Sequence, residues 1–347
     1  MHTSDLHLSE NRPETFAALE KILNKCRERK VDLLTVGGDL FDSERDAEVL
    51  RPKLRRIFSE NPFQIIAIPG NHDKDAYSAN LDFGPDLRIA TTEPFEMYNY
   101  NGISVVAVPY QDQPSDRLLS ELGNAAKDAK TRVLLIHCTL DIGFTSYGFG
   151  EETAKIYFPV SSEILSRLKY DFVLAGHFHT ETCKKSLNGN RCFIYPGSPI
   201  SHTKKERGKR QVVLIDTEIG ETKGIFLDSF YHDSAQLHVS PGKEEETLQT
   251  LKDWMALRST DDCKLEVTVT GFLKISEPEF RKALESIGKN AEIFHEYRNV
   301  ERVLAHPLYD RFLKKLDADE EIEDKENVRN FVIDAMSRLL ADRKLRE

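Results

Sequence analysis

Apolar and polar residues follow two spacings along the first two thirds of the chain. Short apolar runs, typical of buried strands, occupy residues 31–36, 63–68, 103–108, 133–136 and 172–175. Apolar residues recur at helical spacing over residues 14–30 and again up to about residue 58. This strand–helix–strand rhythm predicts parallel strands with helices on both faces. Runs at 192–195, 212–216 and 224–227 lack intervening helices and predict a second, antiparallel sheet stacked on the first.

The pattern changes near residue 232. Residues 233–297 read as strand, helix, strand, helix and strand, which predicts a small α+β domain. Residues 298–347 hold two helical stretches separated by an acidic run. The expected fold is therefore α/β, with a large domain over residues 1–232, the small domain and a helical tail. Only three residues precede the first polar motif, so we expect either a truncated first strand or a start further upstream.

Polar side chains occur in five blocks at the points where strands should end, four of them directly after apolar runs and one after the short first segment. They are Asp5 and His7, Asp39 and Asp42, Asn71 and His72, His137, and His177 and His179. Ligands of open α/β sheets collect beyond the carboxyl ends of the strands, so these side chains are expected to converge. Any one block alone is more often a turn or a helix cap. All five together predict a single centre for two metal ions.

The donor types narrow the choice of metal. Carboxylate, amide and imidazole groups without a thiolate favour octahedral Mn, Fe or Ni over structural zinc. Two ions roughly 3.5–4 Å apart need one bridging carboxylate. We assign that role to Asp39, because it follows the central strand over residues 33–36.

Composition restricts the class of protein. The chain has 347 residues and a net charge of −10, which argues against strong bulk attraction to nucleic acid but leaves room for a local basic patch. No apolar run is long enough to span a bilayer, and the first residues already belong to the motif, so neither a membrane segment nor a signal peptide is expected. The five cysteines form no CxxC pair, which indicates reduced thiols and a cytoplasmic location.

The set DxH…GDxxD…GNHD…H…GHxH resembles the calcineurin-like metallophosphoesterase superfamily over roughly residues 1–230. The resemblance implies a four-layer α-β-β-α sandwich and two divalent ions. Matched by position, one ion would be held by Asp5, His7, Asp39 and His179, and the other by Asp39, Asn71, His137 and His177. His72 would be the acid that protonates the leaving oxygen.

Within this superfamily the chain is most similar to the meiotic recombination 11 / SbcD nucleases. The similarity rests on residues 2–8, 38–41, 108–110 and 195–198, on the small α+β domain and on the helical tail. It implies a manganese-dependent DNA exonuclease and endonuclease subunit in double-strand-break repair. The small domain would be a cap that helps to position DNA, and the tail would bind an SbcC-type coiled-coil ATPase. A homodimer is left open.

Asp42 departs from the nuclease pattern, which commonly has a histidine three residues after the bridging aspartate. We expect Asp42 to bond His72, fix its tautomer and raise its pKa. The alternative is an aspartate that only starts a helix. The departure keeps a second function open, a small-molecule phosphatase or cyclic-nucleotide phosphodiesterase with the same site. A non-catalytic scaffold is disfavoured because the ligand set is intact.

Two further segments are candidates for substrate contact. Residues 202–210 form the strongest basic cluster, and Lys204, Lys205 and Arg207 are its expected DNA contacts. A solvated hairpin loop is the equal alternative. The glycine-rich and aromatic residues 143–150 could stack on a base, or pack as an ordinary loop.

Overall fold

The computed structural model describes residues 1–77, 82–141, 157–180, 182–258 and 262–344. The aromatic segment 143–150 lies outside these residues, so the expectation about it stays a prediction. The described chain divides into two compact units, Met1–His232 and Asp233–Glu347.

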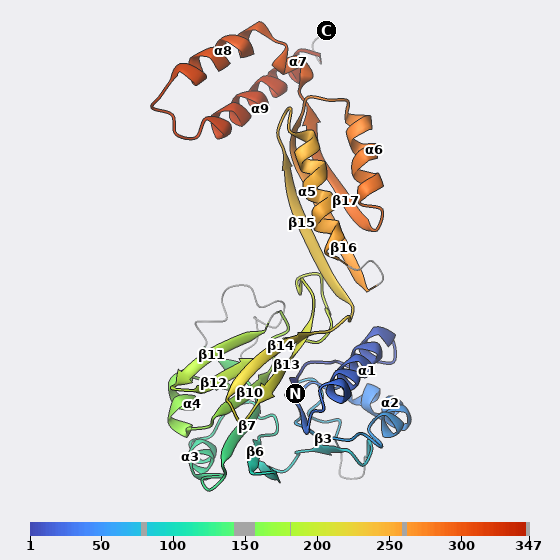
Figure 1. The fold of residues 1–347 in the computed structure, drawn as a ribbon, viewed down its shortest axis with the longest axis vertical. Helices are drawn as coiled ribbons and strands as arrows, with labels where there is room; N and C mark the ends of the chain where they lie inside the picture. The colour runs from blue at the N-terminus through green and yellow to red at the C-terminus, as the bar shows by residue number, and fades with distance from the viewer. Residues whose placement is uncertain (78–81, 142–156, 181, 259–261, 345–347) are drawn as a thin grey trace. The chain divides into compact units, whose positions relative to one another are not determined.

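Two six-stranded sheets form the first unit (Figure 1). The strands of one are β1 (His2–Thr3), β2 (Leu33–Val36), β3 (Gln64–Ala67), β4 (Leu87–Ile89), β13 (Gln211–Asp216) and β14 (Glu221–Phe226), in the order β14-β13-β1-β2-β3-β4. The strands of the other are β5 (Glu96–Tyr100), β6 (Ile103–Ala107), β7 (Thr131–His137), β10 (Phe172–Gly176), β11 (Cys183–Asn188) and β12 (Arg191–Tyr195), in the order β11-β12-β10-β7-β6-β5. A separate pair joins β8 (Thr139–Leu140) to β9 (Pro159–Val160).

Helices cover the outer face of each sheet, as Figure 1 shows. Helices α1 (Pro13–Glu28) and α2 (Glu44–Ile57) pack on the first sheet, and α3 (Asp116–Asn124) and α4 (Ser162–Leu168) pack on the second. Ser43, Ser115 and Ser161 cap the starts of α2, α3 and α4 through their hydroxyl oxygens. The inner faces of the two sheets share one core. The first unit is therefore the expected α-β-β-α sandwich.

Strand β3 shows how the layers form. Its alternate residues divide between two cores: Ile65 packs toward the helices, and Ile66 packs between the two sheets. Such a strand is buried on both faces, which explains why it reads as an unbroken apolar run.

The prediction that residues 192–227 build a separate antiparallel sheet is wrong. Strand β12 pairs in parallel with β10, with Cys192 opposite Phe172. Strand β13 instead pairs antiparallel with β1, with Val213 opposite His2. Each strand extends an existing sheet, and the β13–β14 hairpin covers an edge that β1 would otherwise leave unpaired. Local sequence cannot reveal this choice, because it depends on pairing between distant segments.

The second unit opens with a three-stranded sheet in the order β15-β16-β17. Its elements are β15 (Tyr231–Val239), α5 (Glu244–Ala256), β16 (Cys263–Leu273), α6 (Glu277–Ile287) and β17 (Ala291–Asn299). This is the expected strand–helix order. Leu251 of α5 and Phe280 of α6 pack on Val267 and Val269 of β16. Strand β17 ends at Asn299, two residues beyond the predicted end of the small domain at residue 297. The division into three domains stays a prediction.

Helices α7 (Glu301–Leu304), α8 (Pro307–Ala318) and α9 (Lys325–Lys344) complete the second unit. Tyr309 and Ile333 are buried in a small cluster that also holds Phe272 of β16. Phe331 and Leu339 of α9 are 74% and 66% exposed. Within the described residues, no helix combines the length and the apolar character needed to cross a bilayer.

Candidate metal centre

The predicted ligands lie where parallel strands end. Asp5, Asp39 and Asn71 follow β1, β2 and β3 of the first sheet. His137 ends β7, and His177 follows β10, the neighbouring strand of the second sheet. The carboxyl edges of the two sheets therefore bring the five blocks to one place.

Several ligands have strained backbones. Asp5, His7, Asp39 and His177 have φ angles of 54°, 45°, 50° and 111°, a region that side chains other than glycine rarely adopt. Strain of this kind costs on the order of 1–3 kcal/mol per residue and gathers at functional sites. Close approach of the loops also needs glycine. A Cβ atom on Gly38 would clash with the His137 ring, and one on Gly70 would clash with the Asp39 carboxyl group.

Asp39 lies between the two predicted ion sites and is only 1% exposed. Its Oδ2 is 3.5 Å from His137 Nε2 and 3.8 Å from His7 Nε2. Its Oδ1 accepts a hydrogen bond of 2.9 Å from the His72 backbone N–H. Burial opposes ionisation, but the facing imidazoles of His137 and His7 hold the pKa of Asp39 below its usual range. The geometry suits a bridging carboxylate.

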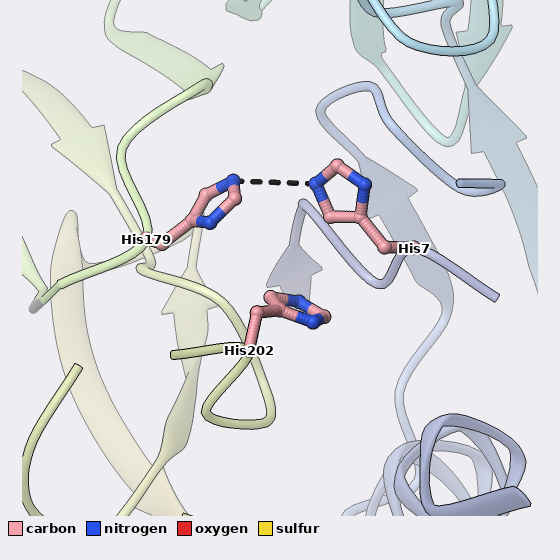
Figure 2. A group of neighbouring side chains, drawn as sticks. All are labelled: His7, His179 and His202. Carbon is pink, nitrogen blue, oxygen red and sulfur yellow. Dashed lines mark hydrogen bonds between the residues drawn. The ribbon is translucent and has the colours of Figure 1, made fainter. Parts of the chain in front are cut away.

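On one side of Asp39, the imidazoles of His7 and His179 face each other, with their Nε2 atoms 3.2 Å apart (Figure 2). The Nδ1 atom of His7 is 3.3 Å from Asp42, and that of His179 is 3.4 Å from Glu206. Without an ion, a proton on one of the two Nε2 atoms makes the hydrogen bond drawn in Figure 2. A carboxylate near Nδ1 favours the proton on that nitrogen, and both Nε2 lone pairs would then be available to a cation. Asp5 completes the side, with Oδ1 3.8 Å from His179 Nε2.

On the other side, His137 faces Asn71. His137 Nδ1 donates to the carbonyl of Gly37 at 2.8 Å, and its Nε2 lies 2.9 Å from Asn71 Oδ1. In neutral His137, the Nε2 lone pair therefore points at a carbonyl oxygen, which again suits a cation. The His177 ring lies 5.4 Å from the His137 ring, and its backbone N–H donates to both oxygens of Asp5 at 3.1 Å.

These residues fit two divalent ions. Three sets bring their donor atoms within 4.8 Å of one another: Asp5, Asp39 and His137; His7, Asp39 and His72; and His7, His179 and His202. Five of the seven sequence-predicted ligands belong to these sets, and the sets also include His72 and His202. The other two predicted ligands, Asn71 and His177, lie next to His137. Their donors are oxygens and imidazole nitrogens, which suit six-coordinate ions such as manganese.

His72 lies on the solvent side of the centre. Its side chain is exposed, and its ring meets the His7 ring edge-on at 4.7 Å. A group in this position can reach a bound phosphoester, as the acid role requires.

Asp42 contacts His7, which the sequence did not predict. Its Oδ1 faces His7 Nδ1, and this contact lowers the pKa of Asp42. The helix-start alternative is wrong, because Ser43 caps α2. The hydrogen bond between Asp42 and His72 stays a prediction.

Asp73 is a buried carboxyl group whose role the sequence reasoning missed. It accepts hydrogen bonds from the backbone N–H groups of Gly70 and Phe41, and from the Tyr77 hydroxyl. Burial, followed by the charge of Asp39, raises the pKa of Asp73 to about 6. Asp73 therefore ties the loop that carries Asn71 to the loop that carries Asp39. In the sequence, Asp73 could have been recognised as a site residue because it directly follows Asn71 and His72.

His202 was also missed as a site residue. Its ring lies 4.8 Å from that of His7 and 5.3 Å from that of His179 (Figure 2). Arg12 Nη1 donates to His202 Nδ1 at 2.8 Å, so His202 Nε2 must carry the proton that bonds the carbonyl of Asp5 at 2.9 Å. Burial, then the neighbouring His7 and His179, lowers the pKa of His202 well below its usual value. Both ring nitrogens are engaged, so His202 supports the ligands and is not one of them.

The basic cluster 202–210 contains two different kinds of residue. His202, Glu206 and Arg210 turn inward, and Arg210 donates to the carbonyls of Ser198 and Thr180 at 2.9 and 2.7 Å. Lys204, Lys205 and Arg207 are exposed. The backbone N–H of Glu206 bonds the carbonyl of Thr203, which makes Lys204 and Lys205 the tip of a turn.

The model of one family matches this part of the chain. The calcineurin-like phosphoesterase family matches residues 1–181, and the chain belongs to that family. It is thus a metallophosphoesterase, a phosphoester hydrolase with candidate residues for divalent metals. A solved structure described as GAP50, the anchor in the inner membrane complex of Plasmodium, is similar to 66% of this chain and 88% of its own, with 11% identity and a TM-score of 0.40. A likeness this distant carries no argument about substrate.

Proposed function

We propose that the protein is a manganese-dependent DNA exonuclease and endonuclease subunit of double-strand-break repair. The observation that carries the proposal is the turn 203–206. The turn presents the exposed Lys204 and Lys205, and it is anchored to the predicted ligand His179 through Glu206 and His202. Exposed cations next to a phosphoesterase centre suit a polyanionic substrate, for which phosphate contacts supply most of the affinity.

The residues divide the chemistry as follows. The predicted ligands on either side of Asp39 would hold two divalent ions, and those ions would supply binding of the phosphate oxygens and a more acidic water as the nucleophile. Asp39 holds the two halves of the site together. His72, exposed beside His7, is placed to give a proton to the departing oxygen. The exposed lysines hold neighbouring phosphates of the strand.

The second unit supplies the proposed partner site. Sequence similarity to the SbcD nucleases suggests that residues 303–343 bind the base of an SbcC-type coiled-coil ATPase. Phe331 and Leu339 lie eight residues apart on α9, which places both on one exposed face. Val332, Met336 and Leu340 of the same helix pack inward instead.

A small-molecule phosphatase or cyclic-nucleotide phosphodiesterase is the second candidate. Asp42 favours it, because a histidine commonly occupies this position in the nucleases. The net charge of −10 also favours a small substrate over a long polyanion.

A panel of substrates with manganese separates the two. Single- and double-stranded DNA, cyclic nucleotides and p-nitrophenyl phosphate esters are compared with one preparation. Hydrolysis of DNA well above that of the small esters supports the nuclease. Hydrolysis of the small esters alone would refute it.

The basic turn gives a second test. Replacing Lys204, Lys205 and Arg207 with alanine should weaken DNA binding and flatten its salt dependence, by about 0.9 unit of slope for each phosphate that the variant no longer neutralises. Lys127 and Lys130 are matched controls, since they are exposed but precede β7 and so lie at the opposite end of that strand from His137. An unchanged slope in the triple variant, measured by titration at several salt concentrations, would place the turn away from DNA.

A further inference from the structure

Glu206 is a carboxylate with an unusual environment. It is 2% exposed, although it sits in the most basic segment of the chain. Glutamate is almost never buried to this degree unless its charge is paired and hydrogen-bonded. The surroundings of Glu206 should therefore explain why the chain keeps it there.

Four groups surround the two carboxylate oxygens. Oε1 is 3.4 Å from His179 Nδ1 and accepts from the Thr203 hydroxyl at 3.3 Å. Oε2 accepts from the His202 backbone N–H at 2.7 Å and lies 3.2 Å from the Ser198 hydroxyl oxygen. The carboxylate thus joins a metal-facing histidine to three residues of the segment 198–206.

One neighbour of Glu206 leads directly to the metal centre. The guanidinium of Arg210 lies nearby and donates to the carbonyls of Ser198 and Thr180 at 2.9 and 2.7 Å. His179 contacts the carboxylate through Nδ1, and its Nε2 lies 3.2 Å from His7 Nε2. Glu206 therefore acts on the centre through the His179 ring.

We infer that Glu206 is a positioning residue for one of the two metal ions. It holds His179 with the proton on Nδ1, so that Nε2 presents its lone pair toward His7 and the ion. It also makes the His179 ligand more basic and adds negative charge close to a dication. The inference rests on the metal centre of the proposed function, and it holds for any phosphoester substrate.

The same contacts join ion binding to the basic turn. Glu206 closes the turn through its backbone N–H and fixes His202 and Thr203 through its side chain. A shift of the carboxylate would therefore move both His179 and the lysine tip. Loss of Glu206 should weaken the ion and the phosphate contacts together.

The test is metal binding by Glu206→Gln, measured without substrate. Calorimetry with manganese should show one of the two sites weakened by roughly 10–100-fold, the range typical of carboxylates that support a metal-bound histidine. The visible spectrum of the cobalt-loaded protein should change, since it reports the ligand geometry directly. Glu244→Gln is the matched control. Glu244 is a buried glutamate of α5 that accepts from the Lys274 N–H at 2.7 Å, and its loss should leave both readouts unchanged.

Two outcomes would overturn the inference. Glu206→Gln could bind two manganese ions as tightly as the wild type, or Glu244→Gln could weaken them equally. If thermal unfolding shows that Glu206→Gln does not fold, the same manganese titration is done with Glu206→Asp. Aspartate keeps the charge but draws it back from His179, so a folded Glu206→Asp with wild-type metal affinity would refute the inference. A wild type that binds two ions but cleaves only small esters refutes the nuclease function and leaves the role of Glu206 standing.

Discussion

In the metal centre the buried side chains carry charge, whereas on the helical tail exposed side chains are apolar. Asp5, Asp39 and Glu206 are nearly inaccessible, yet Phe331 and Leu339 lie mostly in solvent. Both arrangements cost free energy in the isolated chain. The first cost is recovered when cations bind the converging oxygens and nitrogens. The second is recovered if a partner covers the apolar face. A departure from ordinary burial therefore indicates the kind of ligand that each region takes.

The largest effect is expected in the buried, charged region, when the bridging carboxylate is removed. Asp39→Ala takes away the oxygen that faces both His7 and His137, so both ions should be lost and phosphodiester hydrolysis abolished. Elemental analysis and calorimetry with manganese measure the loss, and chelation of the wild type should reproduce it. Two tightly bound ions in Asp39→Ala would mean that another group bridges.

His72→Ala tests the exposed polar group at the rim of the centre. Turnover should fall by roughly 10²–10⁴-fold, because general acid catalysis is lost while metal and DNA binding remain. Asp42→Asn is the companion variant. A changed pH–rate profile would support its hydrogen bond to His72, while weaker manganese binding would support its contact with His7.

The apolar side of the comparison is tested on α9. Phe331→Asp combined with Leu339→Asp should abolish binding to the SbcC-type ATPase, since each anchor of such an interface contributes about 2 kcal/mol or more. Manganese-dependent hydrolysis by the isolated protein should be unchanged. Leu308→Asp changes an exposed apolar residue on α8 instead, so it distinguishes a contribution of α8 to binding from that of α9. Co-purification with the ATPase measures binding, and full binding by the double variant would refute the docking surface.

The smallest expected effect concerns His2, a buried histidine outside the ligand set. Its ring bonds Thr35 Oγ1 at 3.0 Å and the carbonyl of Ala175 at 3.2 Å, and burial lowers its pKa to about 4. The unfolded chain binds the proton more readily, so stability falls as the pH drops below the unfolded pKa of about 6.5 toward the folded value. Between pH 7 and pH 5 the loss should be about 2 kcal/mol. Urea unfolding of wild type and His2→Gln checks this, and an equal pH dependence would contradict it.

The sequence located the candidate ligands because they follow strand ends, and most of these strand ends can be recognised from local apolar runs. It also revealed the order of elements around β16. It could not reveal that β13 pairs with β1, because that pairing joins residues about 200 positions apart. Nor could it reveal Glu206, whose neighbours in sequence are lysines and arginine. The inward turn of Glu206 depends on His179 lying beside it in space.

The left-handed backbone at Asp5, His7 and Asp39 has a consequence for engineering. Glycine adopts such angles without steric cost, so a chain with glycine at these positions should fold at least as easily and hold no ions. Screens that reward only thermal stability would favour such inactive sequences. Selection for robustness in this protein therefore has to be coupled to a measurement of bound metal.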